Sequence, residues 1–382
     1  MLEDFLDKKP LYYDEIDYER MPRVYRRIKE HFSFGKIIHI IGTNGKGTTG
    51  RFLATALSRS GFNTGHYTSP HILTFNERIW FNEKDVSMEE LEETHKKLLS
   101  VLTQEEADSL SYFEYTTLLA MLYFSHQSDY IILEAGLGGC DDATAVFDKE
   151  LTLVTPIDKD HEAFLGRSID AIARKKLGAI QKAAIIAKQS HGDVYEVLRE
   201  LQESRGFVSY DYKEFLEDRD RDALYRIAKH EKLPEYLREN LSMAIAALNY
   251  LQLSYRVEDF YNARLFGRLT KLNENIIVDV GHNLLAAKSI FESLKPKKYI
   301  LIYNSYKDKN YKEILSVLKP IIEYVELIDV YNNRIEESCY IQEALDLLEI
   351  SYRKFEQIQE DKSYLVFGSF SVVEAFLKEY RG

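Results

Sequence analysis

The sequence predicts an α/β protein with a mostly parallel sheet and a second, smaller α/β domain. Short apolar runs alternate with helix-length segments along the 382-residue chain, which is the signature of βαβ units. The chain is also longer than one typical domain of roughly 150 residues. The alternation pauses at residues 256–269 and then restarts. We therefore expect an N-terminal domain at residues 1–262 and a smaller Rossmann-like domain at residues 263–382.

Composition narrows the class of protein. Hydrophobic residues make up 45% of the chain and charged residues 29%, and no apolar run approaches the ~20 residues of a membrane helix. The net charge of −12 argues against general nucleic-acid binding, which needs a basic surface. The first ten residues are too acidic for a signal peptide, and Cys140 and Cys339 are too far apart for a disulfide framework. We expect a cytoplasmic protein without nucleic-acid or membrane partners.

The elements of the first domain follow from apolar runs and helix end signals. Ser87 and Glu90 form a capping-box pattern that opens a helix, and Gly61 ends an earlier one. In chain order we expect a strand at 36–42, helices at 46–60, 87–101 and 113–126, strands at 129–136 and 151–157, a helix at 168–177, a strand at 183–188, and helices at 193–205 and 236–252.

The second domain begins with another apolar run. IIVDV predicts a strand at 276–280, and further strands are expected near 298–303, 324–329 and 364–367. The helix-length segments between them again predict βαβ connections.

The first expected strand leads into a glycine-rich loop, GTNGKGT, before the helix begins. In a phosphate-binding loop, backbone N–H groups turn toward phosphate oxygens, a lysine neutralises charge and a hydroxyl binds magnesium. The loop departs from the usual G-x-x-x-x-G-K-[ST] pattern, because Ile40 replaces the first glycine and Gly47 separates Lys46 from Thr48. The alternative is a glycine-rich turn with a surface lysine. The residues that we expect to bind ATP here are Gly42, Thr43, Asn44, Gly45, Lys46, Gly47 and Thr48.

Glu134 ends a buried strand just before a second glycine-rich turn, AGLGG. Its carboxylate is expected at the C-terminal edge of the sheet, beside the phosphate loop, where magnesium needs an oxygen ligand. An acidic residue that merely caps the turn is the alternative. A dinucleotide-binding fingerprint is disfavoured, because Asp141 occupies the place of its third glycine.

The loop GTNGKGT resembles that of the folylpolyglutamate and dihydrofolate synthases, members of the Mur ligase superfamily. Further motifs follow in that family's order, and the resemblance extends from about residue 22 to the C-terminus. These motifs are YTSPH (67–71), NERI (76–79), FEYTT (113–117), LEAGLGGCDDAT (133–144), DKDHEAFLGRSIDAIA (158–173), REN with the following helix (238–247), FGR (266–268), DVGHN (279–283), KD (307–308) and GSF (368–370).

This resemblance implies an ATP-dependent carboxylate–amine ligase that adds L-glutamate to dihydropteroate, tetrahydrofolate or both through an acyl phosphate. It implies two magnesium ions, held by Thr48 and Glu134 and by His161 and a carbamylated Lys176. On chemistry alone, His161 would be a structural histidine, because magnesium prefers oxygen ligands. Lys176 would likewise be explained by the favourable position of a cation at the end of a helix.

The resemblance also places substrate contacts. Asn240 and Arg268 are expected at the nucleotide, and Asp279 and His282 near its outer phosphates and the incoming amino acid. Ser369 matches a position near glutamate. The positions on the folate side are Ser69, His71 and Asp142.

The sequence departs from the family pattern at several supporting positions. Arg is replaced by Cys140, Glu by Lys175, Ala by Leu177, and proline by Phe266 and Leu284. We expect these changes to affect loop geometry and substrate choice more than the reaction.

Three matters stay open: which pterin acid is used, the state of Lys176, and oligomeric form, for which the resemblance implies a monomer. The alternative functions are a muramyl peptide ligase, which would carry a further domain of about a hundred residues before the loop, and a nucleotide-binding homologue without ligase activity.

Overall fold

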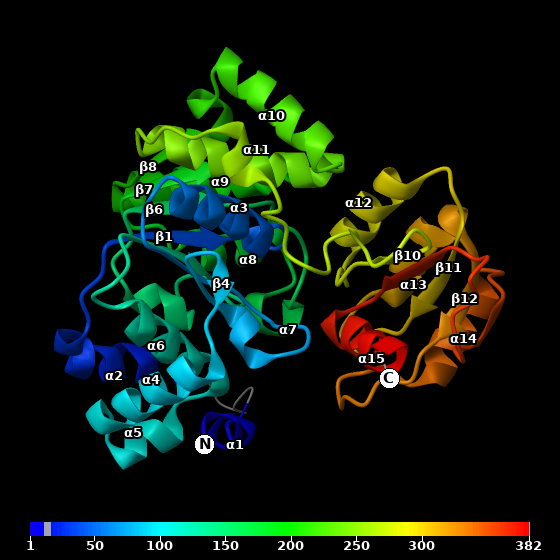
Figure 1. Ribbon diagram of the computed structural model, residues 1–382, viewed down its shortest axis with the longest axis horizontal. Coiled ribbons are helices and arrows are strands. Elements are labelled where there is room, and N and C mark those ends of the chain that lie inside the picture. The colour runs from blue at the N-terminus through cyan, green and yellow to red at the C-terminus, as the bar shows by residue number, and fades with distance from the viewer. Residues whose placement is uncertain (11–16, 382) are drawn as a thin grey trace. The chain divides into compact units, whose positions relative to one another are not determined.

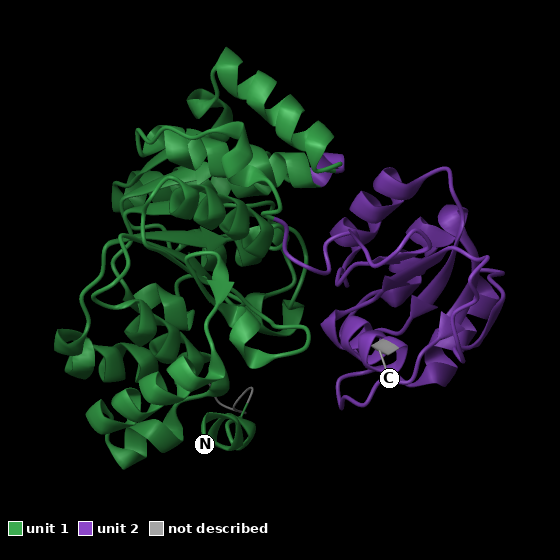
Figure 2. Ribbon diagram, in the orientation of Figure 1, with its two compact units in different colours: residues 1–233, 237–263 green, residues 234–236, 264–382 purple. Residues whose placement is uncertain are grey.

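The computed structural model describes residues 1–10 and 17–381, which form two compact units (Figures 1 and 2). Unit 1 comprises residues 1–233 and 237–263, and unit 2 comprises residues 234–236 and those from 264 onward. Each unit contains one mostly parallel sheet with helices packed against it, so the predicted α/β fold class is confirmed. In the described ranges, no helix combines the length and apolar character that crossing a membrane requires.

The sheet of unit 1 has eight strands in the order β4-β3-β2-β5-β1-β6-β7-β8. Among the described strands of this sheet, β2 with β3 and β3 with β4 are the antiparallel pairs, and the other pairs are parallel. Because β1 lies between β5 and β6, the loops after these strands meet at one edge, the place where open α/β sheets bind ligands. The strands are β1 Lys36–Ile41, β2 Thr64–Tyr67, β3 Ile79–Phe81, β4 Lys84–Asp85, β5 Tyr130–Glu134, β6 Leu151–Val154, β7 Ala183–Ile186 and β8 Val208–Asp211.

The helices of unit 1 cover both faces of this sheet (Figure 1). Such covering explains why β1 is buried at every residue from 37 to 41 and reads as a continuous apolar run interrupted by His39. The predicted capping box at Ser87 is confirmed, as is Gly61 beyond the end of α3, with φ 94°. The helices are α1 Leu2–Asp7, α2 Arg20–Ile28, α3 Lys46–Arg59, α4 Met88–Val101, α5 Gln104–Ser109, α6 Tyr112–Phe124, α7 Glu162–Leu165, α8 Ile169–Leu177, α9 Gly192–Arg205, α10 Asp218–His230 and α11 Glu235–Tyr250.

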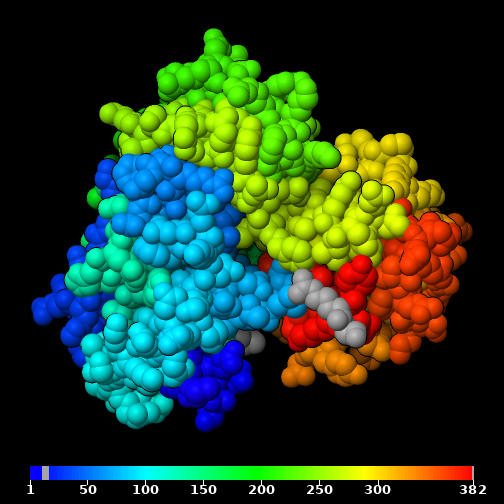
Figure 3. Space-filling model, viewed as in Figure 1, coloured from blue at the N-terminus to red at the C-terminus, as the bar shows by residue number. Residues whose placement is uncertain are grey.

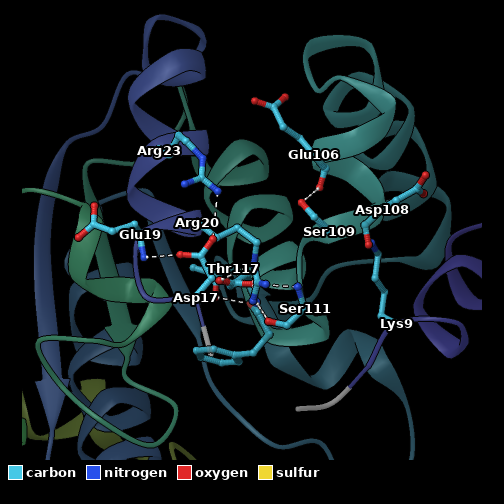
Figure 4. A network of polar contacts seen from close by, with 12 residues as sticks. Lys9, Asp17, Glu19, Arg20, Arg23, Glu106, Asp108, Ser109, Ser111 and Thr117 are labelled. Atoms are coloured by element: carbon cyan, nitrogen blue, oxygen red, sulfur yellow. Dashed lines mark hydrogen bonds and ion pairs between the residues drawn. The ribbon is translucent and has the colours of Figure 1, made fainter. Parts of the chain in front are cut away.

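The N-terminal residues pack against α4, α5 and α6, although the sequence pattern predicted no element there. Leu2 and Leu6 of α1 join the hydrophobic core. The Lys9 ammonium donates to the carbonyl oxygens of Ala107 and Asp108 at the end of α5 (Figure 4). Cations are favoured at such a position because the last carbonyls of a helix lack partners.

Helix α10 lies on the surface of unit 1 (green in Figure 3). It buries Ala223 and Ile227, whereas Tyr225 on its other side is 63% exposed. This two-sided pattern is typical of an amphipathic surface helix.

Unit 2 has a six-stranded sheet in the order β13-β12-β11-β14-β10-β9, in which only β9 runs antiparallel. Its core is a separate apolar cluster that includes Leu301, Val325 and Leu365. The strands are β9 Thr270–Lys271, β10 Ile276–Val278, β11 Tyr299–Tyr303, β12 Ile322–Leu327, β13 Tyr352–Lys354 and β14 Tyr364–Phe367, and the helices are α12 Leu284–Leu294, α13 Tyr311–Leu318, α14 Ser338–Leu347 and α15 Phe370–Arg381.

Strand ends and very short strands account for the main differences from prediction. The strand predicted at 151–157 ends at Val154, and Pro156, two residues further on, has no N–H with which to continue the ladder. The strand predicted at 276–280 ends at Val278, and the side chain of the next residue, Asp279, accepts backbone N–H groups from Leu269 and Gly281. Strands β2, β3, β4, β8, β9 and β13 were not predicted, since two to four residues carry little periodicity.

Candidate active site

The glycine-rich loop connects β1 to α3, as the sequence predicted. Gly42 and Gly45 have φ values of 138° and 90°, in the region that favours glycine. A Cβ at Gly42 would clash with Thr155, and one at Gly45 would lie 2.5 Å from Asn240 Oδ1. The loop is held in place because Thr43 N donates to the Pro156 carbonyl at 2.9 Å. Two of the predicted ATP-binding positions therefore require glycine for conformational reasons.

Lys46 is the first residue of α3 and folds back over the loop. Its Nζ lies 3.3 Å from the Gly42 carbonyl, 3.2 Å from the Thr43 carbonyl and 4.0 Å from Glu134 Oε1. The side chain is 12% exposed. A lysine beside the N-terminus of a 14-residue helix favours an anion.

Thr48 and Glu134 offer oxygen atoms at the same edge. Thr48 is 1% exposed, and its Oγ1 finds no hydrogen-bond partner among the described residues. Glu134, 5% exposed at the end of β5, accepts from the Thr68 hydroxyl and from Ser69 N at 3.2 Å. A buried hydroxyl without a partner is costly, whereas magnesium prefers hydroxyl and carboxylate oxygens. This donor set fits the magnesium ion that the sequence predicted.

Lys176 lies in the last turn of α8 and is 3% exposed. Its Nζ donates to the carbonyls of Gly42 at 2.9 Å and Leu137 at 2.8 Å. Burial, with a smaller effect of the Lys46 ammonium, lowers the pKa of Lys176 to about 7. The unmodified Lys176 side chain thus links the phosphate loop to the loop after β5.

His161 follows β6 at the same edge and opens the short helix α7. Its φ of 51° places it in the left-handed region, and its N donates to Asp160 Oδ1 at 2.8 Å. The same loop is tied to the phosphate loop by Thr43, whose Oγ1 donates to the Asp158 carbonyl at 2.9 Å. Asn44 N also approaches the Pro156 carbonyl, at 3.4 Å.

The residues predicted on the folate side already have protein partners. His71 Nδ1 accepts from Arg78 Nε at 2.8 Å, and burial together with Arg78 lowers the pKa of His71 to about 4, so the ring is neutral at pH 7. Asp142 Oδ2 accepts from Gly136 N at 3.0 Å and Leu137 N at 3.2 Å. Asp142 therefore shapes its own loop.

In unit 2, Asp279 is 4% exposed and accepts from the backbone N–H groups of Leu269 and Gly281, each at 2.8 Å. Burial raises the pKa of Asp279, and Arg268 opposes this shift. The Arg268 guanidinium lies 5.3 Å from the centre of the Phe370 ring.

The other two predicted residues of unit 2 make local contacts. His282 Nδ1 lies 3.1 Å from the Val280 carbonyl. Ser369 is fully buried and accepts from Val372 N at 3.1 Å, at the start of α15.

The structure thus gathers Lys46, Glu134, Lys176 and Asn240 around the phosphate loop of unit 1, and Arg268 beside Asp279 in unit 2. The individual roles of the predicted residues stay predictions. Sequence reasoning missed Thr68 and Thr155, which support Glu134 and Gly42. Each follows a strand at the same edge of the sheet, and that position was the available signal.

The chain is similar to proteins of known activity. It is 31% identical to the dihydrofolate synthase/folylpolyglutamate synthase of Buchnera aphidicola subsp. Schizaphis graminum, covering 88% of this chain and 86% of the relative. It is 32% identical to the Escherichia coli K12 protein of the same name, covering 75% of this chain and 71% of the relative. No family model matches.

Comparison with solved structures points to proteins of the same kind. The crystal structure of Helicobacter pylori folylpolyglutamate synthetase has a TM-score of 0.80 and 35% identity, covering 100% of this chain and 98% of that one. The Yersinia pestis bifunctional synthase in complex with AMPPNP and Mn ion, at 24% identity and a TM-score of 0.84, shares the fold.

Proposed function

The chain belongs to the dihydrofolate synthase/folylpolyglutamate synthase family, and from this we infer that it is an ATP-dependent ligase that joins L-glutamate to a pterin-bearing acid. The bond formed is C–N, and the acceptor is dihydropteroate, tetrahydrofolate or both. The observation that carries this proposal in the structure is the phosphate loop, with the unpartnered Thr48 hydroxyl on the helix that follows it and the Glu134 carboxylate beside Lys46.

The first step transfers a phosphoryl group. A carboxylate oxygen of the pterin acid attacks the γ-phosphorus of ATP, the bond to the β–γ bridging oxygen breaks, and ADP leaves with the formation of an acyl phosphate. Carboxylate and triphosphate repel each other, so the site must offset negative charge. Lys46 and the N–H groups at the start of α3 are the groups of this chain that do so.

The second step forms the amide. The neutral amino group of glutamate attacks the acyl carbon, the bond to the phosphate oxygen breaks, and inorganic phosphate leaves as the nitrogen loses a proton. We propose Asp279 and His282 as the residues that act near the amino acid. Water must be kept from the acyl phosphate during this step, since hydrolysis would waste it.

The proposed metal ligands are Thr48 and Glu134 for one ion, and His161 and a carbamylated Lys176 for a second. When bound, magnesium neutralises phosphate charge. The unpartnered Thr48 hydroxyl supports the first ion. The second depends on modification of a lysine whose lowered pKa leaves part of it as the free amine near pH 7.

Several assignments stay predictions: ATP binding by residues 1–262, glutamate ligation by residues 263–382, the absence of nucleic-acid partners, a cytoplasmic location and a monomeric form.

The test supplies purified protein with Mg-ATP, L-glutamate and either dihydropteroate or tetrahydrofolate. ADP release that requires both glutamate and a pterin acid, with a product heavier by one glutamate residue, is the expected result. The preferred pterin separates the two activities named for the family. ADP release that ignores both pterins, or its absence under all conditions, would favour a nucleotide-binding homologue without ligase activity.

A further inference from the structure

A buried histidine interrupts the apolar strand that leads into the phosphate loop. His39 lies in the middle of β1 and is fully buried. Its Nε2 lies 2.8 Å from Thr144 Oγ1, and Thr144 Oγ1 lies 2.6 Å from Asp142 Oδ1. Thr144 N donates to the same carboxylate oxygen at 3.0 Å. The three side chains form a continuous chain of hydrogen bonds from the interior of the sheet to the loop after β5.

The chemistry of these hydrogen bonds determines which nitrogen of the His39 ring carries the proton. An ionised carboxylate only accepts hydrogen bonds, so the Thr144 hydroxyl donates its single proton to Asp142. Thr144 Oγ1 must then accept from His39, which requires a hydrogen on Nε2. The other ring nitrogen, Nδ1, has no hydrogen-bond partner among the described residues, as expected for the bare nitrogen of this tautomer.

Protonation of Nδ1 would create a cation in the core. The charged groups near the ring are the Lys149 ammonium, and the Asp142 carboxylate through Thr144. Burial, and to a smaller extent Lys149, hold the pKa of His39 well below its usual value. The ring therefore stays neutral.

The series of hydrogen bonds continues beyond Asp142. Its Oδ2 accepts from Gly136 N and Leu137 N, and the Leu137 carbonyl accepts from Lys176, which also donates to the Gly42 carbonyl. The loop at residues 135–144 is thus hydrogen-bonded to His39 through Thr144, and Lys176 joins it to the phosphate loop. An aliphatic residue at position 39 would fill the strand equally well but could not donate to Thr144.

We propose that His39 is a positioning residue for the pterin acid: its Nε2–H, acting through Thr144, fixes the Asp142 carboxylate and the loop at residues 135–144. This inference rests on the proposed function and on the prediction that Asp142 lies on the folate side of the site. A histidine that only satisfies its own polar atom in the core would not affect acceptor binding.

The structure provides a matched control. Thr152 on β6 lies directly beside His39 in the sheet and is equally buried. Its Oγ1 has no hydrogen-bond partner in the described part of the chain. Thr144→Val and Thr152→Val thus make the same substitution on neighbouring segments, and only the first breaks the chain.

The kinetic experiment measures KM for the pterin acid, KM for ATP and the melting temperature in both valine variants and in His39→Leu, which removes the donor to Thr144 but keeps the Thr144–Asp142 hydrogen bond. We expect His39→Leu to raise the pterin KM as Thr144→Val does, and a wild-type pterin KM in His39→Leu would overturn the proposal. We expect Thr144→Val to raise the pterin KM at least about tenfold, the loss typical of a hydrogen bond to a charged group. Its KM for ATP should stay within about twofold of the wild-type value, Thr144→Ser should restore the pterin KM, and Thr152→Val should change neither constant. Equal effects of the two valine variants on the pterin KM would overturn the proposal.

A second readout does not depend on activity. In the full chain with ¹⁵N-labelled histidine, spectra that correlate ring nitrogens with ring protons should show His39 protonated at Nε2 and bare at Nδ1, with His39→Gln assigning the signal. A proton on Nδ1 would overturn the proposal even in an active enzyme. Loss of all pterin-dependent turnover in the wild type would overturn the proposed function, and the positioning role with it. The tautomer would then test only the hydrogen-bond chain.

Discussion

At the scale of single residues, Glu134 shows why a charged group is buried at this edge of the sheet. It lies at the end of β5 with Lys46 at 4.0 Å and two hydrogen-bond donors from residues 68 and 69. A buried carboxylate is costly unless it is paired or binds a metal. Its surroundings therefore agree with a site that brings cations and phosphate together.

Glu134→Gln keeps the size of this side chain and removes its charge. We expect pterin-dependent ADP release to fall at least about 100-fold, because the proposed magnesium ion loses an anionic ligand. Steady-state kinetics with Mg-ATP checks this, and Glu200→Gln, at an exposed position of α9, serves as the control. Unchanged turnover in Glu134→Gln would show that the carboxylate is not part of the metal site.

Lys149 is a second buried charge, outside the predicted site. It is 1% exposed, and its ammonium donates to the Ala145 carbonyl. Burial lowers the pKa of Lys149 to about 7, although Asp142 and Asp148 oppose the shift. An unfolded lysine titrates near 10.5, so between pH 7 and 10.5 the unfolded state binds more protons than the native state. The contribution of Lys149 to stability therefore rises with pH across this window and is constant at its lowest value below pH 7.

Lys149→Met removes this titration. We expect the free energy of unfolding of the variant to rise less steeply than that of the wild type between pH 7 and 9.5, as measured by urea denaturation at several pH values. Lys176 shares the same window, so a part of the slope should remain. The exposed Lys188→Met should leave the slope unchanged. A slope in Lys149→Met equal to that of the wild type would contradict the low pKa.

At the scale of secondary structure, the first turn of α6 is anchored twice. Ser111 and Glu114 form a capping box, and Glu114 also pairs with Arg20 of α2 at 2.9 Å. Figure 4 shows Arg20 close to Ser111. The two charged side chains are only 10% and 13% exposed, so water would solvate neither charge well if the other were removed.

Arg20→Met should lower the free energy of unfolding by about 3 kcal/mol, because breaking a buried pair leaves one charge uncompensated. The double variant Arg20→Met/Glu114→Gln should recover part of this loss. Arg174 makes comparable pairs on the surface, where water screens the charges, so Arg174→Met should lower the free energy of unfolding much less than Arg20→Met does. Denaturant unfolding measures all three, and equal losses for Arg20→Met and Arg174→Met would refute the distinction.

At the scale of the whole molecule, the chain provides a probe for one unit. Trp80 is the single tryptophan of the sequence, and it lies on β3 in unit 1, 4% exposed. Its fluorescence therefore reports the unfolding of unit 1, whereas circular dichroism reports helices of both units.

Mg-ADP at about 100 times its Kd should stabilise the transition seen by Trp80 by about 2.7 kcal/mol, since ligand bound only to the native state adds its binding free energy. The phosphate-binding loop in unit 1 is the reason to expect this. Phe164→Ala, an exposed change on α7, should melt like the wild type without ligand. If Mg-ADP left the unfolding transition seen by Trp80 fluorescence unchanged, this would contradict ATP binding by the first unit.

The local features of the fold were predictable because each depends on neighbouring residues. The glycines of the loop, the capping box at Ser87 and the buried strand before Gly42 follow from backbone conformation, helix-end chemistry and the apolar pattern, and the structure contains all three. Six short strands, β2, β3, β4, β8, β9 and β13, and the N-terminal helices were not predicted, because their stability comes from packing against distant segments.

The α/β class, the phosphate-type loop and the family could be predicted before the fold was known, since short contiguous motifs specify them. Contacts between distant groups became apparent only in three dimensions: Asn240 lies against Gly45, Lys176 donates to the Gly42 carbonyl, and Thr144 is hydrogen-bonded to His39. The physical reason is that a parallel sheet brings the ends of strands far apart in sequence to one edge, where hydrogen bonds depend on position in space and leave no periodic signal in the chain.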